Sequence, residues 1–515
     1  MGNGTTSVWI ATSKDTHFES LNKDVKVDVA IVGGGIAGLT TALLLKNAGI
    51  TVAVVEKSRI ATGETGYTTA HITEVIDTGY TTLKSDFGLD GARLAAESSR
   101  ASVEQIAAFV KQYNLSCGFS RLPAYVYTET DADVASLIDE LLVMQKVGID
   151  ADWVDDAPLP YPTKGAIKVN NQAQFHPRDY LLPLANAIYG DGSYVFENTR
   201  ATEIDDGEPC CVHTPDGMIT AKNVVIATNS PVSNWLFLIT KIPAYRTYAI
   251  GAVLKDERPI GGLFWDTADP YHYIRSQSVQ PEDGNSAHEI LIVGGEDHKT
   301  GTKEHTEECF ERLESYTRAR FDIADVLYRW SGQIMEPIDG LPYIGVNSFA
   351  KHQFVATGFT GNGMTFGTLS GMILSDLILG KKNRYAELYD ATRIHALASA
   401  SDFVSENKDF PTYFVGDRLA KADTDSLDQV GLNEGKIVKL NGEKAAVYRD
   451  EHGQLHACSP VCTHMACYVH WNNAEKSWDC PCHGSRFDPD GKVANGPAVK
   501  DLEPIKLPEA APAGE

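Results

Sequence analysis

Cysteine and histidine residues are interleaved near the C-terminus, where five of the nine cysteines of the chain gather. Cys462 and His464 form a C-x-H pattern, and Cys480 and His483 form a C-x-x-H pattern shortly after it. Two thiolates and two imidazoles can hold a tetrahedral zinc ion. In a chain without an export signal, such clustering favours a metal over a disulfide framework. We therefore expect a metal centre in this part of the chain.

The full sequences around these residues are more specific than a zinc pattern. The boxes CTHMAC (462–467) and CPCHGSRF (480–487) resemble the signature of Rieske [2Fe–2S] domains, and residues 434–462 resemble the opening strands of that family. The resemblance implies that Cys462 and Cys480 bind one iron, whereas His464 and His483 bind the other. Neutral imidazoles reduce the negative charge of the cluster, which is why Rieske centres lie at roughly −150 to +300 mV and plant-type clusters near −400 mV.

The same resemblance implies roles for four neighbouring residues. Cys467 and Cys482 stand where the cytochrome bc-type Rieske subfamily forms a disulfide between the two cluster loops. Ser485 matches a serine whose hydroxyl donates to a cluster sulfide and favours the reduced form. Phe487 stands where high-potential members carry a tyrosine, so we expect a potential below those members and above thiolate-only ferredoxins. The edges of the two histidine ligands are the expected exit for electrons.

A second chemical motif lies near the N-terminus. Gly33, Gly35 and Gly38 form G-x-G-x-x-G between the apolar run 27–32 and a helical pattern at 36–47. The first glycine permits a tight turn, the second lets the backbone approach a pyrophosphate, and the third lets the helix pack on the strand. The N-terminus of that helix favours phosphate, and Glu56, at the end of the next apolar run, can accept hydrogen bonds from a ribose diol. Together these features predict a dinucleotide site.

Which dinucleotide is bound is indicated further along the chain. Residues 330–345 (WSGQIMEPIDGLPYIG) and 354–371 (FVATGFTGNGMTFGTLSG) resemble the closing segment of the FAD family that includes D-amino-acid oxidase and glycine oxidase. The resemblance spans about residues 8–395 and implies that FAD is the cofactor. It adds to the expected FAD-binding residues a threonine after a second nucleotide-side strand and a glycine-rich segment beside the isoalloxazine: Thr228, Gly361, Asn362, Gly363 and Met364. No second G-x-G-x-x-G unit occurs, so no NAD(P) domain is expected.

The two sites together predict a redox enzyme acting on CH–NH or CH–NH2 groups. Members of the FAD family resemble C–N oxidases, in which the flavin removes a hydride equivalent beside an amine and O2 usually reoxidises it. A fused one-electron centre favours electron transfer from FAD to the Rieske cluster and on to an external one-electron acceptor. Two alternatives stay open, an O2-using amine oxidase with a structural or redox-sensing cluster and a non-catalytic electron-transfer protein. A Rieske oxygenase is not expected, because the 32 residues after His483 are too few for its mononuclear iron site.

The substrate is defined only as a small-molecule amine. Family members that oxidise amino acids commonly carry an arginine shortly before the DG-x-P segment, where it pairs with the substrate carboxylate in a bidentate way. Residues 332–338 read GQIMEPI and contain no arginine. The catalytic residues are therefore unknown, with four weak candidates in the expected substrate part: Arg246, Tyr248, His272 and Arg275.

The elements that must position these residues predict an α/β protein with a further all-β domain. We expect a Rossmann-like FAD-binding domain with an antiparallel-sheet substrate domain in residues 1–397, a linker at 398–428 and an all-β Rieske domain at 429–515. Within the first region we assign about 25–90, 150–235 and 325–395 to FAD binding. About 95–150 and 236–325 are assigned to the substrate part.

The composition is strongly acidic, with 45 Lys and Arg against 69 Asp and Glu and a formal net charge of −24. Such a surface repels phosphate backbones and anionic lipids, so we expect no nucleic-acid partner and no peripheral membrane binding. No apolar run is long enough to predict a membrane span. The N-terminus lacks the basic and apolar regions of a secretory signal, so a cytoplasmic location is expected.

Overall fold

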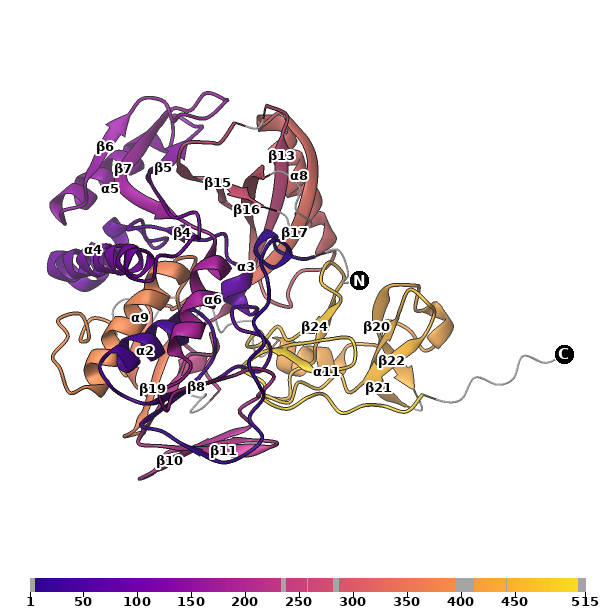
Figure 1. The fold of residues 1–515 in the computed structure, drawn as a ribbon. Coiled ribbons are helices and arrows are strands. Elements are labelled where there is room, and N and C mark those ends of the chain that lie inside the picture. Colours follow the sequence, from indigo (N-terminus) through magenta and orange to yellow (C-terminus); the bar gives the residue numbers. More distant parts are fainter. Residues whose placement is uncertain are drawn as a thin grey trace.

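A computed structural model describes residues 5–232, 238–256, 258–280, 287–394, 412–440 and 442–507 (Figure 1). Residues 398–411 of the predicted linker lie outside the described residues. None of the described helices is both long and apolar enough to cross a membrane.

A six-stranded sheet forms the centre of the N-terminal region. Its pairs are parallel except for β18 with β19, and its order is β18 (Tyr343–Val346), β19 (Gln353–Thr357), β12 (Asn223–Ile226), β2 (Val29–Val32), β3 (Val52–Val55) and β8 (Tyr194–Phe196). Every residue of β2 and β3 is buried, because both faces of the sheet are covered. This explains the continuous apolar runs in their sequences.

Helices cover one face of this sheet. They are α2 (Ile36–Asn47), α6 (Pro177–Ile188) and α9 (Gly363–Ile378), and the side chains of Ile31 and Val54 pack in their cluster. The opposite face, with Val32 and Val55, packs on a four-stranded sheet with the order β1 (Val25–Lys26), β11 (Gly217–Ala221), β10 (Cys210–Thr214) and β9 (Glu203–Asp205). The two layers hold the ends of β2, β3 and β12 together at one edge.

A nine-stranded sheet forms the second large layer. Its main path is β17 (Ile323–Met335), β13 (Ala244–Leu254), β16 (His288–Lys299), β15 (His272–Val279), β14 (Leu263–Asp266), β5 (Ser120–Thr128), β7 (Gly165–Gln174) and β4 (His71–Ile72), and β6 (Ala151–Val154) pairs with β7. The sheet is antiparallel except for the parallel pair of β14 and β5. Helices α4 (Tyr80–Gln112), α5 (Val134–Lys146) and α8 (Glu307–Arg320) lie beside it (Figure 1).

The nine-stranded sheet crosses the predicted division of the first region. Strands β6, β7 and most of β17 lie in segments that we assign to FAD binding, 150–235 and 325–395, yet they belong to the nine-stranded sheet. Neighbourhood in the sequence misled the prediction, because β17 leads directly into the glycine-rich closing segment. The chain passes between the two sheets more often than the predicted division into segments allows.

The C-terminal domain consists of two small antiparallel sheets. One has the order β20 (Glu434–Leu440), β21 (Glu443–Arg449) and β22 (Leu455–Cys458), and the other has β23 (His470–Asn472), β24 (Ser477–Asp479), β25 (Arg486–Phe487) and β26 (Val493–Asn495). In Figure 1 the domain, in orange and yellow, lies beside the N-terminal region, with β24 nearer to that region than β20–β22. The second sheet therefore provides the contact surface between the domains.

Candidate active site

A cavity of about 620 Å³ lies between the six-stranded and nine-stranded sheets, and the C-terminal domain also borders it. Residues predicted for FAD binding line it, and they come from the ends of β2, β3 and β12 and the start of α9: Gly33, Gly35, Glu56, Thr228, Gly361, Asn362, Gly363 and Met364. Gly38 lies within the first turn of α2, next to this wall. The fold thus brings together residues from distant parts of the sequence.

The glycine-rich loop is shaped by close backbone contacts. Gly33 has φ +114°, and a Cβ there would collide with the backbone of Ala227 at the end of β12. A Cβ on Gly38 would collide with the carbonyl oxygen of Gly33, so this glycine lets α2 approach the turn. Gly35 caps α2 without a side-chain hydrogen bond, and the start of this helix lines the cavity. The N–H of Ile36 donates to the hydroxyl of Thr65 at 3.2 Å. Such a helix start suits a pyrophosphate.

Glu56 connects this loop to the end of β3. Its carboxylate accepts hydrogen bonds from the N–H groups of Gly34 at 2.8 Å and Ser58 at 2.9 Å. Enclosure within the cavity wall raises the pKa of Glu56 above its ordinary value. The side chain is thus fixed at the position where a ribose diol would donate to it.

The opposite end of the cavity contains the glycine-rich segment before α9. The Asn362 side chain donates to the carbonyl of Val75 at 2.8 Å and accepts from the N–H of Asp77 at 3.1 Å. The carboxylate of Asp77 in turn accepts from the N–H of Gly361 at 2.9 Å. Asp77 faces the lumen of the cavity, where enclosure by protein raises its pKa to about 6. These bonds fix the start of α9 against the segment that follows β4.

The predicted metal ligands lie in two loops of the C-terminal domain. Backbone hydrogen bonds close both loops, from Cys462 N–H to the carbonyl of Cys467 at 2.8 Å and from Cys480 N–H to the carbonyl of Ser485 at 2.8 Å. The rings of His464 and His483 meet edge to face with centroids 5.0 Å apart. The two loops therefore present their histidines on the same side.

The neutral state of the two histidines suits iron binding. Burial lowers the pKa of His464 to about 4 and that of His483 to about 3, so both imidazoles are neutral at pH 7. The thiols of Cys462 and Cys480 are hydrogen-bonded to each other, and this contact lowers the pKa of Cys462 to about 7 and raises the pKa of Cys480, so the pair shares one proton before iron binds. Buried thiols and neutral imidazoles form the donor set that a Rieske cluster requires.

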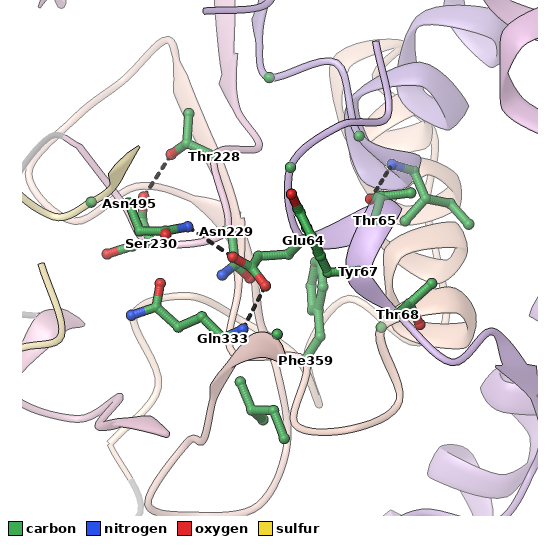
Figure 2. Close-up of a pocket in the computed structure, with 18 of the residues that line it drawn as sticks. Glu64, Thr65, Tyr67, Thr68, Thr228, Asn229, Ser230, Gln333, Phe359 and Asn495 are labelled. Carbon is green, nitrogen blue, oxygen red and sulfur yellow. Dashed lines mark hydrogen bonds between the residues drawn. The ribbon is translucent and has the colours of Figure 1, made fainter. Parts of the chain in front are cut away.

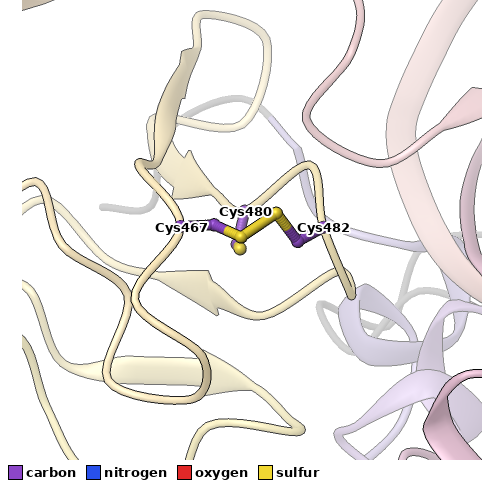
Figure 3. A group of neighbouring side chains, drawn as sticks. All are labelled: Cys467, Cys480 and Cys482. Carbon is purple, nitrogen blue, oxygen red and sulfur yellow. A yellow bond between two sulfur atoms is a disulfide. The ribbon is translucent and has the colours of Figure 1, made fainter. Parts of the chain in front are cut away.

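A disulfide joins the two loops (Figure 3). The sulfur atoms of Cys467 and Cys482 are 1.96 Å apart, and Cys480 lies beside them. These are the two cysteines for which the Rieske resemblance implies a disulfide. Because their sulfur atoms bind each other, Cys462 and Cys480 are the thiols of the boxes that remain for a metal.

Comparisons with known proteins agree with both sites. The family described as FAD dependent oxidoreductase matches residues 28–377, and the Rieske [2Fe-2S] domain matches residues 422–506. The chain belongs to the FAD-dependent oxidoreductase family. It carries a C-terminal Rieske domain, and its cofactors are FAD and a [2Fe–2S] cluster.

Relatives share either the whole chain or its oxidoreductase region. The chain is 33% identical over 502 residues to the putative Rieske 2Fe-2S iron-sulfur protein YhfW of Bacillus subtilis, and the match covers 97% of each chain. It is 25% identical to the gamma-glutamylputrescine oxidoreductase of Escherichia coli, over 74% of this chain and 90% of that protein. The structure of glycine oxidase from Geobacillus kaustophilus superposes with a TM-score of 0.61 at 19% identity, covering 72% of this chain and 99% of that one.

Three of the four candidate catalytic residues do not line the FAD cavity. Tyr248, His272 and Arg275 are absent from the described lining of the FAD cavity. The Tyr248 hydroxyl lies 3.0 Å from His298 Nε2, His272 Nδ1 lies 2.9 Å from the carboxylate of Asp266, and Arg275 donates to the carbonyl of Ala70 at 2.6 Å. Each of the three connects strands or segments inside the fold, which is the more frequent role of buried polar residues in a sheet.

Arg246 is the candidate that does line the cavity. Its side chain is buried and forms an ion pair with Glu475 of the Rieske domain and a hydrogen bond with Ser331. Within the described residues, its Nε and Nη1 atoms have no hydrogen-bond partner. Both atoms are buried, so the guanidinium has two donors without a partner at the cavity wall.

Several lining residues are not among the predicted site residues. Trp265, Tyr271 and Tyr273 contribute aromatic rings from the nine-stranded sheet, and His71 lies against two of them, with ring centroids 4.8 Å from Trp265 and 6.0 Å from Tyr273. Burial lowers the pKa of His71, so its ring is neutral. Asp77 was missed as well, because no motif marks it. The only available signal was the aromatic run at 271–273, which a core strand would show equally.

Proposed function

We propose that the chain is an amine dehydrogenase that passes electrons from its FAD to its own Rieske cluster and then to an external one-electron acceptor. The reaction class is oxidation of a CH–NH or CH–NH2 group. When bound, FAD supplies the two-electron oxidation and the cluster supplies a one-electron outlet. The relative from Escherichia coli, which is named for γ-glutamylputrescine, and the glycine oxidase fold support an amine-type substrate.

One residue carries the electron-transfer part of the proposal. Gln333, in β17, lines the FAD cavity, and its side-chain amide donates to the carbonyl of Gly484 at 2.7 Å. Gly484 lies in the cluster loop directly after His483. A Cβ on Gly484 would collide with Ala244, so the loop packs directly on β13. A single side chain thus separates the cavity from the loop that holds a cluster ligand.

The two histidines differ in their surroundings, which supports a direction for the electrons. His483 is 7% exposed and lies in the loop that packs on the oxidoreductase domain, whereas His464 is partly exposed. This difference favours His464 over His483 as the exit for electrons. We assign the entry of electrons to the 480–485 loop and their exit to the 462–467 loop.

Arg246 is the residue proposed to position the substrate. Arg246 lines the cavity and has two donors without a described hydrogen-bond partner, which a carboxylate or another acceptor group of the amine would satisfy. The aromatic residues Trp265, Tyr271 and Tyr273 provide the apolar part of the same wall. Arg246→Lys should keep the charge, lose the planar donors, and raise KM for substrates that carry a carboxylate.

The experiment is anaerobic stopped flow with an amine found by screening for flavin bleaching. In the wild type, cluster reduction should follow flavin reduction within the turnover time. His483→Ala should leave flavin bleaching intact and slow reduction of a one-electron acceptor at least tenfold, whereas His452→Ala, at an exposed histidine of the same domain, should behave as the wild type.

Gln333→Leu gives a milder test, because the cluster keeps all its ligands. Flavin bleaching should remain, and the transfer from flavin to cluster should slow. If His483→Ala turns over normally, or if the cluster stays oxidised beside fully reduced flavin, the relay is wrong. An O2-using amine oxidase with a structural cluster would then be the correct function.

A further inference from the structure

The Rieske domain forms part of the wall of the FAD cavity. Strand β26 and the loop after it contribute six lining residues: Val493, Ala494, Asn495, Gly496, Ala498 and Val499. Glu475 and Arg486, from the same sheet region, line the cavity as well. These residues face the part of the oxidoreductase domain that contains Glu56 and Thr228. The domain that holds the cluster therefore also encloses the space for the other cofactor.

Hydrogen bonds hold this wall in place along the rim of the cavity (Figure 2). The Asn495 amide donates to Glu64 at 2.7 Å, and the other oxygen of Glu64 accepts from the N–H of Gln333 at 2.5 Å. Lys57 donates to the carbonyl of Ala494, and Arg200 donates to that of Val493 at 2.9 Å. Glu64, Gln333, Lys57 and Arg200 all line the cavity themselves. Several contacts between the domains are thus made by residues that also form the boundary of the FAD cavity.

A buried charge network strengthens the contact on one side. Glu475 accepts from Arg246 of the oxidoreductase domain and from Arg486 of its own domain, the latter at 2.7 Å. Arg486 also donates to Asp479 at 2.9 Å. The side chains are at most 10% exposed. Separating the domains would leave Arg246 without its carboxylate, so the docked arrangement is favoured.

We propose that docking of the Rieske domain controls the release of FAD. While the domain is docked, β26 and residues 496–499 close the cavity, and FAD leaves slowly. When the domain moves away, that wall is removed and FAD is released faster. By linkage, bound FAD stabilises the docked state to the same extent as docking strengthens FAD binding. The inference concerns cofactor retention and does not depend on the electron-transfer proposal.

A disulfide between the domains tests the proposal directly. A Cβ on Gly496 would lie 3.4 Å from Cβ of Ser230, close to the separation in disulfides, and Gly496 does not have a positive φ. The variant Ser230→Cys/Gly496→Cys is loaded with FAD, then oxidised. FAD release into buffer is followed by the rise in flavin fluorescence. The oxidised variant should release FAD at least tenfold more slowly than the wild type, and reduction of the new disulfide by dithiothreitol should restore the faster rate.

The wild type with and without dithiothreitol controls for the native Cys467–Cys482 disulfide.

A second variant acts in the opposite direction, through a residue outside the described cavity lining. The Thr306 hydroxyl donates to Asn472 at 2.8 Å and accepts from the N–H of Ala474 at 3.0 Å, both in the Rieske domain. Thr306 is absent from the described cavity lining. Thr306→Val should therefore weaken docking without touching FAD, and should speed FAD release at least threefold.

Thr317→Val is the matched control. Thr317 is also buried and lies in α8, but its hydroxyl donates to Leu313 within the same helix at 2.8 Å. Its FAD release should equal that of the wild type. The proposal is overturned if the oxidised double-cysteine variant releases FAD as fast as its reduced form, or if Thr306→Val and Thr317→Val release FAD equally slowly.

Discussion

Glu56 is fixed by two backbone N–H groups at the point where a ribose diol would bind. Removing its carboxylate removes charge-assisted hydrogen bonds, so Glu56→Ala should weaken FAD binding by about 1.5–3 kcal/mol, or about 10- to 150-fold in Kd. Fluorescence titration of the apoprotein measures this change. Iron content should be unaffected, and Glu203→Ala, at an exposed strand position, should bind FAD normally. Unchanged affinity in Glu56→Ala would show that the ribose is held elsewhere.

Ser485 is placed to tune the cluster. Its oxygen accepts from the N–H of Ala498 at 3.0 Å, so its hydroxyl hydrogen is available to donate toward the sulfur of Cys462. Such a bond stabilises the more negative, reduced cluster. Ser485→Ala should therefore lower the reduction potential by roughly 60 mV, which is about 1.4 kcal/mol for one electron.

Phe487→Tyr should shift the potential in the opposite direction, because a tyrosine hydroxyl would add a donor near the cluster. Potentials measured by spectroelectrochemistry at one pH decide both cases. Equal potentials in the wild type and Ser485→Ala would contradict the assigned role of the serine.

The residues that the sequence predicts for the site are those whose roles depend on local geometry. Gly38 is required by a backbone contact with Gly33 in the same turn, and Cys462 and His464 lie in one loop, so short motifs reveal them. Gln333 acts through Gly484, and the partner is far away in the sequence. A glutamine in a strand has no pattern that indicates such a contact.

At the scale of single elements, the cap of α6 makes the stability of the fold depend on pH. His176 caps this helix: its Nδ1 accepts from the N–H of Asp179 at 3.2 Å, which requires the neutral ring. Burial, with Arg275 and Arg178 nearby, lowers the pKa of His176 to about 3. The unfolded chain has the ordinary histidine pKa of about 6.5, so it binds a proton in the window between these values. Stability is therefore full above about pH 6.5 and is lost as the pH falls toward 3.

The expected loss from His176 between pH 7 and pH 5 is about 2 kcal/mol in the free energy of unfolding. Urea titrations of the wild type and of His176→Asn measure it, since asparagine can also cap a helix but does not titrate. The variant should lose about 2 kcal/mol less than the wild type over this range. Parallel losses in both proteins would assign the pH dependence to other groups.

The elements themselves were predictable to different degrees. Strands β2 and β3 and helix α2 follow from continuous apolar runs around a glycine-rich turn, because both faces of this sheet are buried. Strand β7 contains the polar stretch Asn170–Gln172, and its place in the nine-stranded sheet depends on pairing with β5 and β4. Such pairing between distant segments leaves little trace in the local pattern, so the domain division could not be drawn correctly.

At the scale of the whole molecule, the contact between the two domains depends on Glu475. Replacing it with glutamine leaves the guanidinium groups of Arg246 and Arg486 with less negative charge in a buried site, so Glu475→Gln should destabilise the protein by about 3–5 kcal/mol. Calorimetry should show the Rieske domain unfolding at a lower temperature, separately from the rest. Glu443→Gln, at an exposed position of β21, should change stability by less than about 0.5 kcal/mol.

The wall formed by β26 has a consequence for the order of biosynthesis. Translation proceeds from the N-terminus, so the glycine-rich loop, Glu56 and α9 leave the ribosome well before residues 493–499. Domains fold largely in that order. The FAD cavity is therefore open on this side in the nascent protein, and it closes only after β26 has been synthesised. The nascent oxidoreductase region therefore offers its nucleotide cofactor an entry that the complete, docked protein closes.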